Sequence, residues 1–138
     1  MGDAPDHQRL AAEVLGIRGA SPDLARRSDA IVASVFVRIA SYSGRMDLSE
    51  RQVSLLEGLG AGSKPFVAVL FGSPYTATFL QKLPTMLLTY EEFDAVELAA
   101  VRALAGEAPI TGKLPISLPG MFPIGHGLER LAKSTASR

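Results

Sequence analysis

The sequence predicts an α/β fold, in which helices cover both faces of a mostly parallel sheet of about four to five strands. Two short runs, 30–39 and 66–71, are almost continuously apolar, as is typical of strands buried on both faces. Amphipathic helical patterns stand between and after these runs. The loops between them are short, which favours a parallel sheet with right-handed crossovers.

Residues 1–27 are expected to form a helical N-terminal segment. Asp6 can cap a helix that ends near Gly16, and Ser21 followed by Pro22 is typical of the start of a second, short helix. No confident strand stands in this segment. The sequence therefore reads as a truncated domain with an unfilled sheet edge.

The first strand is expected within 30–39, and a helix should follow it. Residues 47–50, Asp-Leu-Ser-Glu, have the spacing of a capping box with Asp47 at the cap. Leucines then share one helical face until Gly60 ends the helix. The second strand, 66–71, leads into Gly-Ser-Pro, where Ser73 should cap a helix that reaches about Leu80.

The last third contains two further extended pieces and one helix. Residues 85–89 predict a short third strand, and 93–104 predict a helix that Gly106 ends. Residues 114–118 are expected as a fourth strand at a sheet edge, because Pro115 and its neighbouring proline donate no ladder hydrogen bond. Residues 131–138 are expected to be a flexible tail. The whole pattern is that of a three-layer, flavodoxin-like sandwich.

Composition limits the classes of function. The chain has 138 residues and equal numbers of basic and acidic residues, 14 each, so one domain without a basic field for nucleic acid is expected. With no cysteine and two histidines, neither a metal site nor a cofactor is expected. No apolar run approaches the roughly 20 residues that span a membrane, and no signal peptide is visible at the start. The compartment, cytoplasmic or exported, stays open.

A glycine-rich stretch, Gly58 to Lys64, has the composition of a phosphate loop but the wrong context. A phosphate-binding loop follows a strand and opens a helix, whereas these glycines follow a helix and precede a strand. They are therefore interpreted as the end of a helix.

The candidate site lies where the predicted strands end, since open α/β sheets bind ligands beyond the carboxyl ends of their strands. Three loops meet there, and all three tyrosines of the chain fall in them. The candidate residues of a ligand rim or of a domain interface are Tyr42, Arg45, Ser73 and Tyr75. Adjacent Glu91 and Glu92 could be paired carboxylates or could oppose a helix dipole. No catalytic residue is predicted, because no serine stands in a nucleophile elbow.

Several segments, in order, resemble the C-terminal α/β domain of glycoside hydrolase family 3, in its bacterial β-N-acetylglucosaminidase branch. They are Ser28–Val32, Lys64–Tyr75, Ala99–Glu107, Ile110–Pro119 and Gly125–Leu128. The resemblance covers about residues 28–130. It implies an accessory domain that supports a catalytic TIM barrel, which is the partner it would have.

In that family the reaction is retaining hydrolysis of a β-linked N-acetylglucosamine, with an Asp nucleophile and a His acid/base on barrel loops. A barrel needs about 250 residues, so this chain encodes none and is expected to be inactive alone. Residues 122–127 resemble the barrel segment that carries the catalytic His. Ile124 is inserted there, however, and no Asp follows, so His126 is interpreted as a turn or packing residue.

Two alternatives remain open at this level. The chain could be a stand-alone, flavodoxin-like binding or interaction module with a ligand in a crevice between Tyr42 and Tyr75. It could also be an independent enzyme, although no pair of residues has a defensible nucleophile–base spacing. The unfilled sheet edge also favours pairing with another chain or with the missing barrel.

Overall fold

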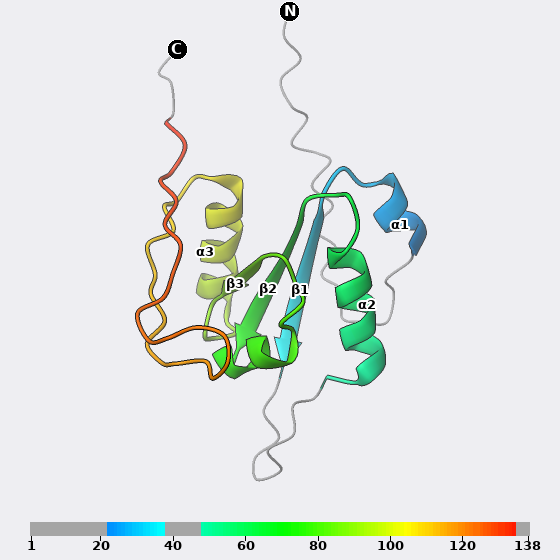
Figure 1. Ribbon diagram of the computed structural model, residues 1–138. Helices are drawn as coiled ribbons and strands as arrows, with labels where there is room; N and C mark the ends of the chain where they lie inside the picture. The colour runs from blue at the N-terminus through cyan, green and yellow to red at the C-terminus, as the bar shows by residue number, and fades with distance from the viewer. Residues whose placement is uncertain (1–21, 38–47, 135–138) are drawn as a thin grey trace, which may run out of the picture.

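The structure, a computed structural model, describes residues 22–37 and 48–134. Three parallel strands alternate with helices along the chain, as the sequence predicts (Figure 1). Of the expected helical segment 1–27, only its last part is described, and it is helical. The elements in order are α1 (Pro22–Arg27), β1 (Ile31–Val37), α2 (Glu50–Gly60), β2 (Phe66–Gly72), the 3-10 helix η2 (Pro74–Phe79), β3 (Met86–Leu88) and α3 (Asp94–Ala105).

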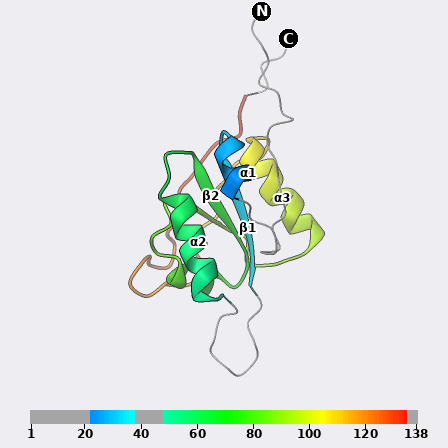
Figure 2. The ribbon, with the colours of Figure 1, turned by 90° about the vertical axis from the view of Figure 1, so that its right-hand side faces the viewer.

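The sheet has the order β1-β2-β3, and both pairings are parallel. Ile31 stands opposite Phe66, and Ala68 stands opposite Met86. Helices lie on both faces, so the predicted three-layer α/β sandwich is confirmed (Figure 2). Among the described residues the sheet has three strands, fewer than the four to five expected.

Side chains alternate between two cores along each strand, as the pleat requires. Even-numbered residues of β2 and odd-numbered residues of β1 face α2, and the remaining ones face α3. The core on the α2 face contains the larger share of the buried side chains: Ala33, Val35, Val37, Leu56, Phe66, Ala68, Leu70, Ala77, Leu80, Leu83, Leu114 and Leu118. The core on the α3 face has Val69, Phe71 and Ala100 at its centre.

The expected fourth strand, 114–118, does not join the sheet, and this prediction is wrong. Its backbone instead pairs with the chain that follows it: Leu114 N–H donates to His126 O at 2.8 Å, and Leu118 N–H donates to Phe122 O at 2.8 Å. Pro115 cannot donate to a ladder, while Leu114 and Leu118 are buried in the core on the α2 face. The segment thus closes one face of the sandwich rather than extending the sheet.

The cap of α2 also differs from the prediction. Ser49, not Asp47, is the N-cap, and Asp47 lies outside the described residues. Ser49 Oγ accepts the Gln52 N–H at 3.3 Å, and Gln52 Oε1 accepts the Ser49 N–H at 2.7 Å. The reciprocal pair is a capping box shifted by two residues, with Gln in the place of Glu.

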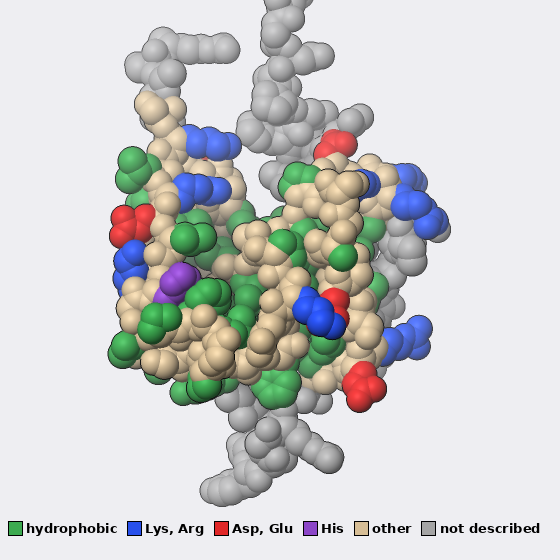
Figure 3. All heavy atoms as spheres, viewed as in Figure 1, with side chains coloured by type: hydrophobic (Ala, Val, Ile, Leu, Met, Phe, Trp, Pro, Cys, Tyr) green, Lys and Arg blue, Asp and Glu red, His purple; other side chains and the backbone are tan. Residues whose placement is uncertain are grey.

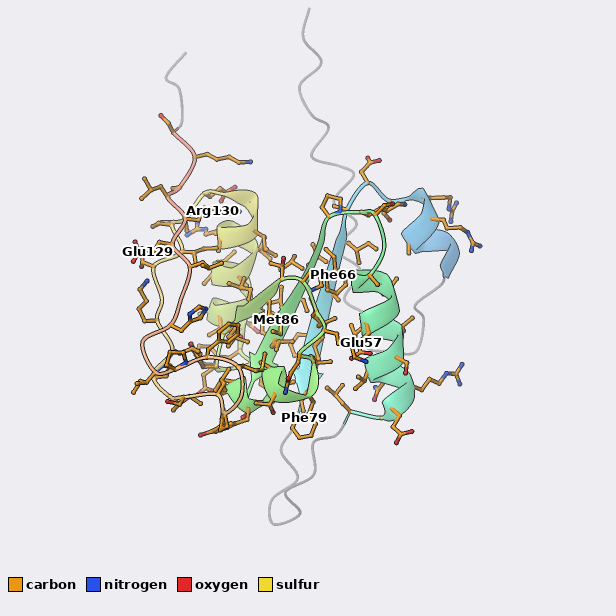
Figure 4. The ribbon with its side chains drawn as sticks, viewed as in Figure 1. Glu57, Phe66, Phe79, Met86, Glu129 and Arg130 are labelled. Atoms are coloured by element: carbon orange, nitrogen blue, oxygen red, sulfur yellow. The ribbon has the colours of Figure 1, made fainter. Side chains whose placement is uncertain are left out.

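The carboxyl end of α3 is set by a glycine and by contacts with the chain that follows. Gly106 has φ 80° and ends the helix as predicted, because only glycine adopts this conformation without cost. The later chain returns to this point: Arg130 donates to Ala103 O, and Lys133 N–H donates to Gly106 O at 2.8 Å. Figure 4 shows Arg130 beside α3. The beginning of the expected flexible tail is therefore hydrogen-bonded to the domain.

Candidate functional site

The three strands are parallel, so their carboxyl ends, Val37, Gly72 and Leu88, meet at one edge of the sheet (Figure 1). The segments that follow these ends contain the candidate residues. Tyr42 and Arg45 lie outside the described residues. Ser73 and Tyr75 are described, and both lie at this edge as predicted from the chain order.

Ser73 has a structural task. Its Oγ accepts the backbone N–H of Tyr75 at 3.3 Å, so it caps η2, and Pro74 occupies the first turn. Gly72 precedes it with φ 96°, and a Cβ on Gly72 would lie 3.0 Å from Val37 O. The turn therefore needs glycine, and it aims Tyr75 outward, with 48% of its surface exposed.

Tyr90 is the functional candidate that the sequence did not single out, although its loop was expected here. It has φ 68°, the left-handed region, where a non-glycine residue is uncommon. Thr89 fixes the chain just before it: the Thr89 N–H and hydroxyl both donate to Leu70 O, at 3.1 and 3.2 Å. Partial burial raises the pKa of the Tyr90 phenol. A strained backbone held by its surroundings is a feature that clusters at functional sites.

Two exposed phenylalanines also follow the carboxyl ends of β2 and β3 in the chain. Phe79 ends η2 with 53% of its surface exposed, and Phe93 precedes α3 with 55% exposed. Phe79 points away from the sheet at the end where the strands finish (Figure 4), and hydrophobic side chains reach the surface there (Figure 3). We call Ser73, Tyr75, Phe79, Tyr90 and Phe93 the carboxyl-edge surface.

The helix expected over 93–104 begins one residue later, at Asp94, so Phe93 precedes it. Phe93 is the N-cap of α3, and its extended backbone turns the side chain out of the helical face that Val96 and Ala100 form. No local pattern in the sequence distinguishes Phe79 from the buried aromatics of the strands.

The two carboxylates near this edge lie on the surface before α3. Glu91 and Glu92 are both exposed and precede α3, which begins only at Asp94. Over residues 22–37 and 48–134, no three His, Cys, Asp or Glu side chains gather in a way that could hold a metal ion.

His126 is engaged in packing within the C-terminal loop. Its ring stacks on Phe122, with centroids 4.2 Å apart and planes inclined by 8°. Its backbone N–H donates to Pro123 O at 3.2 Å, and its carbonyl accepts the Leu114 N–H. These contacts agree with the expected role as a turn or packing residue.

The glycine-rich stretch is a helix end, as its context predicted. Gly60 is the last residue of α2, and a Cβ there would lie 2.9 Å from Pro84 Cδ. Lys64 donates its ammonium protons to Ala25 O at 2.5 Å and Arg26 O at 2.7 Å. The lysine therefore satisfies carbonyls at the end of α1, where a cation also complements the helix dipole.

Comparison of the chain with protein-family models, with curated proteins and with solved structures finds no match. None of the described helices is long and apolar enough to cross a membrane.

Proposed function

We propose that this chain is the C-terminal accessory domain of a retaining β-N-acetylglucosaminidase-like glycoside hydrolase and supports a catalytic TIM barrel on a separate segment or chain. The observation that carries the proposal is the carboxyl-edge surface, where four aromatic side chains are 37% to 55% exposed. The resemblance of residues 28–130 to family 3 domains supplies the identity of the partner.

Exposed aromatics of this kind favour a protein interface. Each Phe or Tyr can bury about 150–250 Å² and is among the residues that dominate interface energetics. Tyr75 and Tyr90 also carry hydroxyls, which can hydrogen-bond at an interface or to a sugar at its rim. In the chain, the four residues follow the carboxyl ends of two neighbouring parallel strands, β2 and β3, with Tyr75 and Phe79 on η2 and Tyr90 and Phe93 before α3.

In this proposal the domain performs no chemical step. The barrel supplies the carboxylate nucleophile and the acid/base group of a retaining mechanism. The accessory domain stabilises the barrel loops. Of the candidate residues, Tyr75 is the best suited to line the rim of the sugar site. This division agrees with the packing role of His126, whose ring stacks on Phe122.

The experiment measures hydrolysis of a chromogenic β-N-acetylglucosaminide by the purified chain, alone and mixed with a separately expressed family 3 barrel from the same source. We expect no hydrolysis by the chain alone, and a gain of barrel activity or thermal stability on mixing. Tyr75→Ala and Phe79→Ala should weaken binding to the barrel at least tenfold, as truncated hot spots do.

The matched control is Leu98→Ala, which truncates an equally exposed apolar residue on α3, 55% exposed and not a member of the carboxyl-edge surface. It should bind the barrel like the wild type. Clear hydrolysis by the chain alone, lost on changing His126 or Glu91, would contradict the proposal, and so would equal losses in all three variants.

One observation favours the second candidate, a stand-alone binding module. The strained backbone of Tyr90, 37% exposed just after the carboxyl end of β3, stands where α/β sheets bind small ligands. In that case N-acetylglucosamine or another small ligand would shift the amide resonances of Ser73 and Tyr90 without any barrel present. No shift with such ligands, together with barrel binding, decides for the accessory domain.

A further inference from the structure

A different edge of the same sheet carries an inference that goes beyond the proposed function and does not depend on it. In the described part of the chain, β1 is an outer strand of the sheet, with β2 on one side. It has seven residues, which corresponds to about 23 Å of strand. The opposite edge strand, β3, has only three residues.

The register shows which backbone groups of β1 face outward. Ile31 N–H donates to Pro65 O at 2.8 Å, and in a parallel ladder every second residue bonds to the same neighbour. Ile31, Ala33 and the later odd-numbered residues therefore bond to β2. The N–H and C=O groups of Val32, Ser34 and Phe36 face away from it, and within the described ranges no hydrogen bond engages them.

Nothing in the strand protects this edge. Natural edge strands usually carry a charged residue, a proline or a bulge that discourages pairing. The sequence of β1, Ile-Val-Ala-Ser-Val-Phe-Val, has none of these. Phe36 remains 39% exposed although its ring stacks on Phe71, with centroids 4.4 Å apart. At the other edge, β3 is only three residues long, which itself discourages pairing with another strand. Of the two edges, β1 is therefore the one open to pairing.

The described helices leave the outer side of β1 without cover. Figure 2 looks toward the β1 side of the molecule: α2 and α3 lie on either side of the strand, and α1 stands at its amino-terminal end. Of the elements with described residues, neither α2 nor α3 covers the edge. Within the described residues, the stretch of β1 with no helix or strand on its outer side is its middle and carboxyl-terminal part.

We propose that a second copy of this chain pairs with β1 in antiparallel register, about a two-fold axis that passes beside Ser34. With Ser34 opposite Ser34 of the second copy, Val32 stands opposite Phe36 of that copy. All of these residues present outward N–H and C=O groups, so every outward donor meets an outward acceptor. A closed two-fold contact of this kind is the commonest symmetry of homodimers.

The side chains are also compatible with self-pairing. The exposed Phe36 gains an aromatic to β-branched cross-strand contact with Val32 of the second copy, a pairing that stabilises sheets. The strand has no charge, so two copies bring no like charges together. The result is a continuous sheet of six strands across the dimer, with the carboxyl-edge surface of each copy left uncovered.

The test measures the mass of the full chain in solution by light scattering after gel filtration, from about 1 to 100 μM. The wild type should approach 29.2 kDa, twice the chain mass of 14.6 kDa, at the upper concentrations. Ser34→Lys and Ser34→Glu should each raise the dissociation constant at least tenfold, because they place like charges directly opposite each other. An equimolar mixture of the two variants should restore the dimer.

Ser54→Lys is the matched control, since it makes the same change at an exposed position of α2. It should leave the mass unchanged. In the wild type, the amides of Val32, Ser34 and Phe36 should exchange with deuterium more slowly at high than at low protein concentration. This measurement decides the question if a Ser34 variant fails to fold.

A wild type that stays at the mass of one chain at 100 μM would overturn the proposal. So would a dimer that tolerates both Ser34 variants, or one whose β1 amides exchange independently of concentration. None of these outcomes bears on barrel binding, which is measured through Tyr75 and Phe79. The two proposals can therefore fail separately.

Discussion

Truncation of one leucine, Leu118, tests whether the segment from Ile110 to Arg130 packs against the sheet as a part of the core. Leu118 is 1% exposed and belongs to the core on the α2 face, although it lies outside every helix and strand. It is held by two backbone hydrogen bonds with Phe122, one of them 2.8 Å and the other 3.0 Å long. If this packing is correct, Leu118→Ala removes a fully buried side chain from a closed core.

The expected loss follows from the burial. The substitution removes three carbons, worth about 2.4 kcal/mol of transfer free energy at roughly 0.8 kcal/mol each. The cavity left behind adds to this, and measured Leu→Ala changes in cores run from about 2 to 5 kcal/mol. We expect a fall of about 3 kcal/mol in the free energy of unfolding, or about 10 °C in Tm for a domain of this size.

The assay is urea unfolding followed by circular dichroism, with the slope m checked for constancy. Leu128→Ala is the control, because it makes the same change ten residues later in the same segment, where Leu128 is 82% exposed. It should change stability by less than about 0.5 kcal/mol. Equal effects of the two substitutions would refute the docking of this segment on the sheet.

Three further outcomes are expected. Ser49→Ala should lower the free energy of unfolding by about 1 kcal/mol in urea unfolding, because it removes the α2 capping box, whereas no loss would contradict that cap. Gly72→Ala should cost about 1–2 kcal/mol in the same assay, since φ is 96° and the new Cβ would lie 3.0 Å from Val37 O, and a gain in stability would contradict it. Burial raises the pKa of Tyr90, so above pH 10 the unfolded state ionises first and stability falls as pH rises. Above about pH 10, the free energy of unfolding should fall less with pH for Tyr90→Phe than for the wild type. Below about pH 9, the gap between the two in free energy of unfolding should not vary with pH.

Local pattern was enough to predict the central elements of the fold. The apolar runs that form β1 and β2 do not show the hydrophobic periodicity of a helix. Glycines end α2 and α3 where the sequence indicates. These signals are local in the chain, so they survive without knowledge of tertiary contacts. The same holds for Ser73, whose capping role depends on the two residues that follow it.

The errors lie where distant contacts decide. An extended, apolar stretch such as 114–118 has the same local signature whether it pairs in a sheet or lies across one. Its actual partners, near His126 and Phe122, follow it in the chain and pair with it through a turn that contains Gly120 with φ 78°. The strained φ of Tyr90 was equally hidden, because Thr89 is held by Leu70, a residue on another strand.

The two cores explain why the edge of β1 and the carboxyl-edge surface should serve different partners. On the α2 face, the chain closes its own core with Leu114 and Leu118, so that layer needs no further cover. On the α3 face, α3 is the one described helix over the three strands, and Phe36 at the β1 side stays 39% exposed above its stack on Phe71. Unsatisfied backbone groups and incomplete apolar cover therefore coincide at β1, where a strand can satisfy both at once. The carboxyl edge, in contrast, presents exposed side chains but no unpaired strand backbone. It therefore favours a partner that docks through side-chain packing rather than through strand pairing.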